Sequence, residues 1–157
     1  MTKHNMLGAP LGFAMLAGCS GGVSETMQPG QWEMTLNVTE ATAPGLSDEM
    51  SADLVAELNR ELAMDPVCVT QADSENPAPR LFLPAEAEGE CDFAGSTVEA
   101  GMISISGSCG DGGVLTIEGA YGGTTMEAVL EARIEDGSEM LEFTAEMNGE
   151  RTGACTG

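Results

Sequence analysis

The strongest constraint on the fold of this chain is an alternation of apolar and polar residues that runs from Cys91 almost to the C-terminus. Alternation with period two is typical of β-strands that bury one face and expose the other. Glycine-containing turn signals interrupt it at Glu99-Ala100-Gly101, Gly110-Asp111-Gly112, Gly122-Gly123, Glu135 to Ser138 and Asn148-Gly149. Glycine tolerates the positive φ that tight hairpin turns need. The segment therefore predicts an antiparallel meander of six strands.

The lengths of these turns predict which residues face one another on neighbouring strands. We expect a three-residue loop at Gly110 to Gly112, a two-residue loop at Gly122-Gly123 and a four-residue loop at Glu135 to Ser138. The resulting pairs are Gly107–Leu115, Ile105–Ile117, Leu115–Leu130, Ile117–Ala128, Ala132–Leu141 and Leu130–Phe143. These registers bring small or apolar residues together on one face and leave threonine and glutamate on the other.

One more strand and a long loop are expected before the meander in the sequence. The segment from Gln31 to Thr39 alternates cleanly, and its apolar face comprises Trp32, Met34, Leu36 and Val38. The segment from Thr70 to Glu90 is rich in proline, alanine and glutamate, which indicates a loop, with a short strand expected at Arg80 to Leu83. The predicted fold is mainly β, a curved sheet or partial barrel of about seven strands with one amphipathic helix.

The helix is expected from Asp48 to Met64, after a loop from Ala41 to Ser47. Ser47 is a suitable N-cap, and Pro66 ends the helix. Its apolar stripe consists of Met50, Leu54, Leu58 and Leu62. A stripe of this kind either covers the sheet of its own domain, which we expect here, or binds a partner.

Length and charge restrict the class of protein. A chain of 157 residues forms one ordinary domain. With 26 acidic and 5 basic residues, its net charge of −21 argues against nucleic acid or anionic lipid headgroups as partners, because both need a basic face. An aromatic content of 4% argues against base-stacking surfaces and aromatic cofactor cradles.

The N-terminus has the layout of an export signal. Lys3 precedes a short apolar stretch from Met6 to Ala17, which is too short for a transmembrane helix. The next residues complete Leu16-Ala17-Gly18-Cys19, which resembles the lipobox of bacterial lipoproteins. We expect a signal peptide over residues 1–18, diacylglycerol on the Cys19 thiol, a tether over residues 19–28 and a domain over residues 29–157. By analogy, Ser20 after the cysteine favours the outer membrane, with the domain facing the periplasm.

From Cys19 onward the chain contains neither histidine nor lysine, and four arginines stand against the 26 acidic residues, a charge of −22. The commonest general base, the commonest transition-metal ligand and Schiff-base chemistry are therefore missing. We predict no catalytic residues, no cofactor and no metal site. A hydrolase that uses paired carboxylates is the enzymatic alternative, although such a site would need a cleft lined with aromatic residues for sugar stacking.

The four other cysteines are Cys68, Cys91, Cys109 and Cys155. An even set in an exported chain predicts two disulfides. A three-residue loop at Glu99 to Gly101 would pair Val98 with Met102 and, further out, place Cys91 opposite Cys109, within disulfide reach. A Cys109–Cys155 bridge is disfavoured, because an Asn148-Gly149 turn would place Cys155 on the face of the sheet opposite to Cys109. We therefore favour Cys91–Cys109 together with Cys68–Cys155.

Several motifs resemble one family along nearly the whole exported chain. They are Pro29-Gly30-Gln31-Trp32-Glu33, Val67-Cys68-Val69-Thr70, Glu90-Cys91-Asp92-Phe93, the Gly101 hairpin running to Cys109, the Gly119 to Tyr121 strand and Arg151-Thr152-Gly153-Ala154-Cys155. In order and spacing they are similar to the bacterial domain-of-unknown-function family 3617. The resemblance implies an exported or lipid-anchored protein, mainly of Gram-negative bacteria, with no established activity.

The favoured function is a noncatalytic binding or structural module of the cell envelope, held at the membrane by its lipid. An apolar concave face could hold a small lipophilic ligand or an envelope partner, and its expected lining is Trp32, Met34, Leu36, Ile103, Ile105, Leu115, Ile117, Met126, Leu130, Phe143 and Met147. Most of these residues are expected to form core. Weak calcium binding is the alternative, at the acidic turns Asp111-Gly112-Gly113 and Glu135-Asp136-Gly137 or on a face carrying Glu118, Glu127, Glu131, Glu142 and Glu146.

Overall fold

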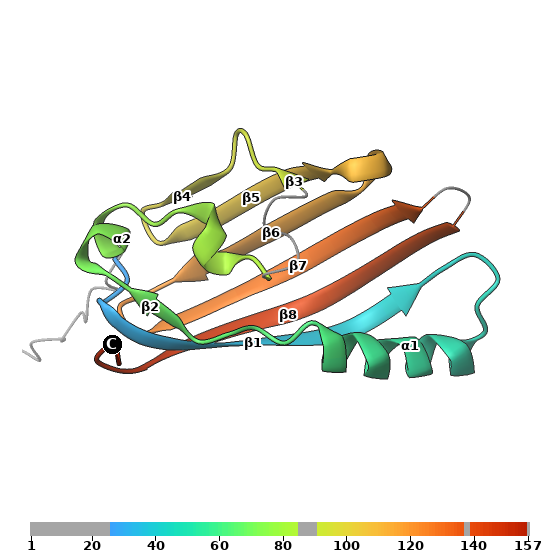
Figure 1. The fold of residues 1–157 in the computed structure, drawn as a ribbon, viewed down its shortest axis with the longest axis horizontal. Helices are drawn as coiled ribbons and strands as arrows, with labels where there is room; N and C mark the ends of the chain where they lie inside the picture. The colour runs from blue at the N-terminus through green and yellow to red at the C-terminus, as the bar shows by residue number, and fades with distance from the viewer. Residues whose placement is uncertain (1–25, 85–90, 137–138, 157) are drawn as a thin grey trace, which may run out of the picture.

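A computed structural model describes residues 26–84, 91–136 and 139–156 (Figure 1). The chain is mainly β, as predicted. Its strands are β1 (Gly30–Thr42), β2 (Val67–Val69), β3 (Cys91–Asp92), β4 (Thr97–Glu99), β5 (Met102–Cys109), β6 (Val114–Tyr121), β7 (Thr125–Asp136) and β8 (Glu139–Gly153). Its helices are α1 (Asp48–Glu61), α2 (Gln71–Glu75) and the 3₁₀ turns η1 (Pro79–Phe82) and η3 (Gly110–Gly112). The predicted signal peptide and the lipidation site Cys19 lie outside the described residues.

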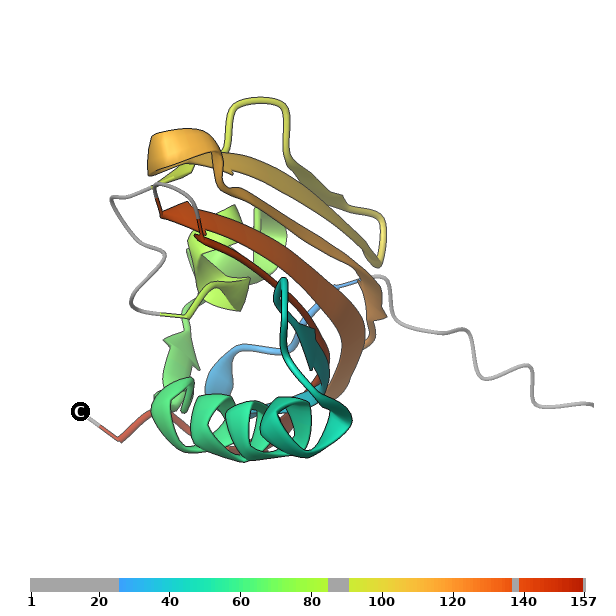
Figure 2. The ribbon, with the colours of Figure 1, turned by 90° about the vertical axis from the view of Figure 1, so that its right-hand side faces the viewer.

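All strands form one antiparallel sheet in the order β2-β1-β8-β7-β6-β5-β3, with β4 also paired to β5. The sheet curls into a half-barrel around the segment that carries α2 and η1 (Figure 2). Its concave face holds the core, whose largest fully buried side chains include Trp32, Phe82, Ile105, Ile117 and Met147. No helix among the described residues is long and apolar enough to cross a membrane.

Glycines on the concave face give the sheet room to curl. Gly149 lies in the middle of β8, where the sequence predicted a hairpin turn at Asn148-Gly149. That prediction is wrong: β8 runs without a turn, and Gly149 pairs with Met34 on one side and Met126 on the other. A Cβ at Gly149 would meet the Met34 sulfur at 2.6 Å. The glycine is therefore needed because the side chains of the neighbouring strands pack against it too closely for a Cβ.

Two predicted registers are wrong by two residues, and one is correct. Ile105 faces Ile117 as expected. Across the next hairpin, however, Ile117 faces Leu130, because the loop has four residues and the Gly122 N–H donates to the Thr125 carbonyl. Ala132 faces Phe143 rather than Leu141, because pairing of β7 with β8 continues to the end of both strands. A shift of two residues keeps each side chain on its face, so the predicted core face is correct.

Helix α1 begins where predicted, with the Ser47 hydroxyl accepting from the Met50 N–H, and ends three residues before the expected Met64. It packs along β1, and Leu54, Leu58 and Leu62 contact the core while Met50 remains exposed. The stripe thus covers the sheet of its own domain.

At both outer edges of the sheet, side chains form hydrogen bonds with backbone groups that no neighbouring strand pairs. On β1, the Val38 N–H donates to Asn59 Oδ1 at 2.7 Å, and Asn59 Nδ2 donates to the Val38 carbonyl at 3.0 Å. On β5, the Ser106 N–H donates to Ser96 Oγ, which in turn donates to the Ser106 carbonyl. Each side chain takes the place of a neighbouring strand.

We expect Asn59→Leu to lower the free energy of unfolding by about 1–3 kcal/mol, because two partly buried backbone groups lose their partners. Asn59→Asp should fall between Asn59→Leu and the unchanged chain, since it keeps the acceptor and loses the donor. Glu57→Ala, an exposed change on the same helix, is the control. Urea unfolding of the three variants measures the effect, and an Asn59→Leu chain as stable as the control would contradict it.

The segment from Thr70 to Glu90 differs from the prediction of a loop with a strand at Arg80 to Leu83. It contains α2 and η1, and Leu81, Phe82 and Leu83 are all buried. Three consecutive buried side chains do not fit the alternation of a strand, and Pro79 favours the start of a helical turn. This segment fills the concave face, where the Phe82 and Tyr121 ring centroids lie 6.4 Å apart.

The folded domain begins earlier than the predicted boundary at Pro29. Met27, which was expected to belong to the tether, is buried and its carbonyl accepts from the Ser74 hydroxyl. The Gln28 N–H donates to the Gly123 carbonyl at 2.8 Å. The chain therefore enters the core beside the β6–β7 turn.

The disulfides are Cys91–Cys109 and Cys68–Cys155, the predicted pairing. The strand pairing that brings these cysteines together differs in part from the expected one. Val98 pairs with Ile103 rather than Met102, and the irregular residues between β3 and β4 restore the register at Cys91. Cys155 reaches Cys68 because Gln31 on β1 pairs with Cys68 on one side and with Gly153 on the other.

Candidate functional site

An apolar cavity of about 500 Å³ opens on the concave side of the half-barrel. Its lining combines side chains from the sheet with one from the end of α1 and one from the end of the segment that carries α2 and η1. These residues are Leu36, Leu115, Leu130, Ala132, Phe143, Leu62 and Pro84. The alternation of β6, β7 and β8 places the sheet residues on this face.

The rest of the lining combines an exposed apolar side chain, an ion pair and a disulfide. Ile134 on β7 lines the cavity and is 48% exposed. Arg133 and Glu135, which form an ion pair, also line it. Cys91 and Cys109 contribute to the wall, next to Gly110 and Gly113. The lining therefore carries two opposite charges beside a mainly apolar surface.

The eleven residues expected to line a ligand site divide into two groups. Leu36, Leu115, Leu130 and Phe143 do line the cavity. The others pack in the core, namely Trp32, Met34, Ile103, Ile105, Ile117, Met126 and Met147. Sequence reasoning missed Ile134, although it continues the alternation of Leu130 and Ala132. The expected loop at Glu135 to Ser138 made Ile134 the last residue of its strand, whereas β7 continues to Asp136.

The glutamates of the convex face do not stack on one another. Glu118 and Glu146 both pair with Val129, which lies between them. Glu127 pairs with Asn148 and Glu131 with Thr144, while Glu142 pairs with Arg133. A second hollow of about 520 Å³ is lined by Glu131 and Glu142 together with apolar side chains such as Val114 and Phe143. No group of three metal-ligating side chains occurs among the described residues.

Gly112 and Glu135, one from each acidic segment considered for calcium, lie close together. A Cβ at Gly112, whose φ is +91°, would meet a Glu135 carboxylate oxygen at 2.8 Å. That carboxylate already pairs with Arg133, which supplies its counter-charge. The arrangement accounts for the glycine at this position, where a side chain would be both strained and crowded.

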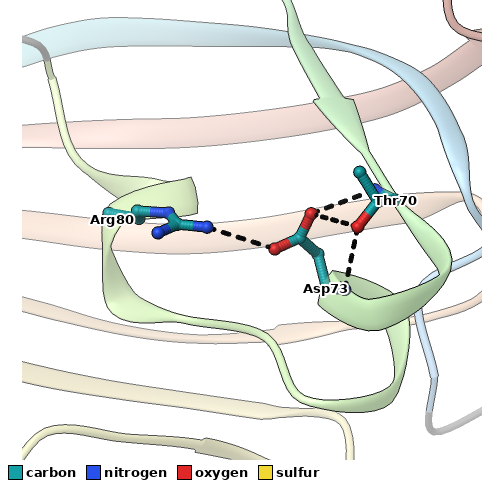
Figure 3. Close-up of polar contacts among 3 residues, drawn as sticks. All are labelled: Thr70, Asp73 and Arg80. Atoms are coloured by element: carbon teal, nitrogen blue, oxygen red, sulfur yellow. Dashed lines mark hydrogen bonds and ion pairs between the residues drawn. The ribbon is translucent and has the colours of Figure 1, made fainter.

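A polar cluster fixes the start of α2 (Figure 3). The Thr70 hydroxyl accepts from the Asp73 N–H, and the Asp73 carboxylate accepts from the Thr70 N–H and hydroxyl, which is a capping box. Arg80 Nη2 lies 3.3 Å from the same carboxylate. Hydrogen bonds from Thr70, together with the Arg80 charge, lower the pKa of Asp73 from its ordinary value of 3.8.

Because the pKa of Asp73 is lowered in the folded state, its contribution to stability is fully present above pH 3.8 and is lost as pH falls through the lower folded value. We expect Asp73→Asn to destabilise the chain at neutral pH and to flatten the loss of stability in acid. Urea midpoints measured from pH 7 to pH 2 test this. Glu49→Gln changes the net charge equally, and an identical pH profile for both variants would contradict the assignment.

Fold and cavity together define a class: an antiparallel half-barrel, linked by two disulfides, with an apolar hollow beside its core. Residues 27–155 match the family described as Protein of unknown function (DUF3617), and the chain belongs to this family. No curated protein and no solved structure matches the chain.

The motifs that carried the resemblance join the two ends of the domain. Trp32 Nε1 donates to the Gln28 carbonyl at 3.0 Å, and Arg151 Nε donates to the Pro29 carbonyl at 2.8 Å. Gly30 has φ of +146°, and a Cβ there would collide with Arg151 and the Gly153 carbonyl. These contacts stabilise the fold and leave the cavity free.

Proposed function

We propose that the protein is a lipid-anchored, noncatalytic binding module of the bacterial cell envelope, and that it holds a small apolar molecule in the cavity of its half-barrel. The observation that carries the proposal is the cavity itself. Its volume of about 500 Å³ lies within the usual range of small-molecule sites, about 300–1,000 Å³. Its walls are mainly leucine, alanine, phenylalanine and isoleucine side chains.

The exposure of Ile134 supports a bound ligand. Burying an apolar side chain is favourable by about 25 cal/mol per Å² of surface. Ile134 leaves almost half of its surface in water although it continues the buried face of β7. An apolar occupant of the cavity would remove that surface from water.

Charge restricts the ligand. The chain has a net charge of −21, and the described residues of the cavity lining include one positive and one negative side chain. A long-range negative potential disfavours anionic ligands. The proposal therefore favours an uncharged or cationic molecule over a fatty-acid carboxylate or an anionic lipid.

We expect Ile134→Gln to weaken binding of the uncharged fluorophore N-phenyl-1-naphthylamine about tenfold, because an occupant would desolvate an amide without a partner at a cost of about 1–3 kcal/mol. Fluorescence titration of the full-length chain with Cys19→Ser, which carries no lipid, measures the affinity. The parent, Ile134→Gln and Val129→Gln chains all carry Cys19→Ser.

Val129→Gln is the matched control. Val129 is on the same strand and is 43% exposed, but it points to the convex face. It should bind the fluorophore as the parent does. Equal loss in both variants, or binding absent from the parent, would contradict a site in the cavity. A partner segment in place of a small molecule would appear as failure of the fluorophore together with protein cross-linking at position 134.

A further inference from the structure

The disulfide Cys91–Cys109 lies in the wall of the cavity, whereas Cys68–Cys155 does not. Cys109 continues the inward-facing alternation of Ile103 and Ile105 on β5, and it packs against the core. Both Cys68 and Cys155 are exposed, near the β2 edge of the sheet. The two disulfides therefore differ in their relation to the same site.

Among the described residues, strand pairing holds only a short stretch of the wall at Cys91. Strand β3 has two residues, which pair with Ser108 and Cys109 of β5. The residues that follow leave the ladder, and Phe93 packs over Gly107, where a Cβ would collide with its ring. Near Cys91 the described contacts with β5 are thus a two-residue ladder, one ring and the disulfide, whereas the Ser96 hydroxyl and β4 bond to β5 further along the chain.

We propose that Cys91–Cys109 makes ligand binding depend on redox state: the oxidised form holds the wall and binds tightly, and the reduced form binds weakly. The inference deepens the proposed function and rests on it. Reduction releases a loop whose ends are separated by 18 residues, so the wall gains freedom that a ligand would have to remove again.

The chemistry is thiol–disulfide exchange with a dithiol reductant. One thiolate of the dithiol attacks a sulfur of Cys91–Cys109, the S–S bond breaks, and the second thiol resolves the mixed disulfide. Two electrons pass from the dithiol to the protein. The products are two protonated cysteines and an oxidised reductant, so atoms and charge balance. In the envelope, the reductant would be a dithiol oxidoreductase.

Binding and reduction must then be coupled in both directions. If reduction weakens binding about tenfold, the ligand must favour the oxidised form by the same factor. The exposed pair Cys68–Cys155 supplies an internal control, because it shares the chain and the reductant but not the cavity wall.

The test uses the full-length Cys19→Ser chain and N-phenyl-1-naphthylamine. The double variant Cys91→Ala/Cys109→Ala should bind about tenfold more weakly, a typical coupling between linked sites, while Cys68→Ala/Cys155→Ala should bind as the parent does. Equal affinity of the parent and the Cys91/Cys109 variant would overturn the redox inference and leave the proposed function standing. Absence of binding by the parent would overturn both.

A second measurement needs no cysteine variant and applies even where the variant fails to fold. In buffers of reduced and oxidised dithiothreitol, alkylation and peptide mass spectrometry report each disulfide separately. Saturating fluorophore should raise about tenfold the ratio of reduced to oxidised dithiothreitol that half-reduces Cys91–Cys109. The ratio for Cys68–Cys155 should not change. Equal shifts for both pairs, or none, would overturn the inference.

Discussion

Replacement of Cys19 by serine should abolish attachment to the membrane. A serine leaves no thiol to accept diacylglycerol, so the chain should remain an unprocessed precursor that retains residues 1–18. The unchanged chain should stay with envelope membranes in high salt and leave them in detergent. Fractionation and the mass of the N-terminal peptide measure both effects.

Electrostatic adhesion cannot imitate this result, because a chain with a net charge of −21 is repelled by anionic headgroups. Ser20→Ala is the matched control, since it alters the neighbouring residue and keeps the thiol. Disulfide formation should be unaffected, because Cys19 belongs to neither of the two pairs. Normal cleavage and membrane retention of the Cys19→Ser chain would contradict lipid anchoring.

Loss of the Cys68–Cys155 disulfide should have the largest effect on stability. Its cysteines are 87 residues apart, and the chain-entropy relation gives about 4–5 kcal/mol for a loop of that length. The bond joins the edge strand β2 to the tail after β8, so it closes a loop that contains α2 and the strands β3 to β8. Urea unfolding of Cys68→Ala/Cys155→Ala measures the loss.

Cys91→Ala/Cys109→Ala provides the comparison, because its cysteines are 18 residues apart. The same relation gives about 3 kcal/mol for this loop, so the two double variants should differ by about 1–1.5 kcal/mol. If the shorter loop proved the more stabilising, native contacts around Cys91 rather than unfolded-chain entropy would determine the order. The m-values should be compared at the same time, since a change would indicate altered residual structure.

The concave face could be predicted from alternation, but the registers of β6 with β7 and of β7 with β8 could not. Leu130 was expected opposite Leu115 and lies opposite Ile117, and both pairings are apolar on the same face. Period two determines which face a side chain occupies and is insensitive to a shift of two residues. The loop lengths determine the register, and these depend on tertiary hydrogen bonds such as that from Gly122 to Thr125.

The Asn148-Gly149 turn failed for a related reason. The dipeptide satisfies a local rule for hairpins, but β8 pairs with β1 and β7 on both sides of it. The hydrogen bonds of these two ladders outweigh the turn propensity of a single dipeptide. The second helix, by contrast, had a readable signal that was overlooked, because Thr70 and Asp73 have the spacing of a capping box.

The cavity was the least predictable part. Four of its residues were among those expected to line a ligand site, but alternation alone cannot distinguish a core position from a cavity position on the same face. The difference depends on which positions of that face other side chains pack against. Ile134 illustrates this, since it shares a face with Leu130, which is 1% exposed, yet is itself 48% exposed.

The segment from Pro79 to Pro84 therefore contributes to the core and to the cavity wall through different residues. Leu81, Phe82 and Leu83 complete the core, while Pro84 forms part of the cavity wall. Insertions or substitutions at its far end would enlarge, narrow or reshape the cavity without touching a strand register. Under the proposed binding function, a lineage with this fold would change its ligand by altering a short connecting segment while the sheet is inherited unchanged.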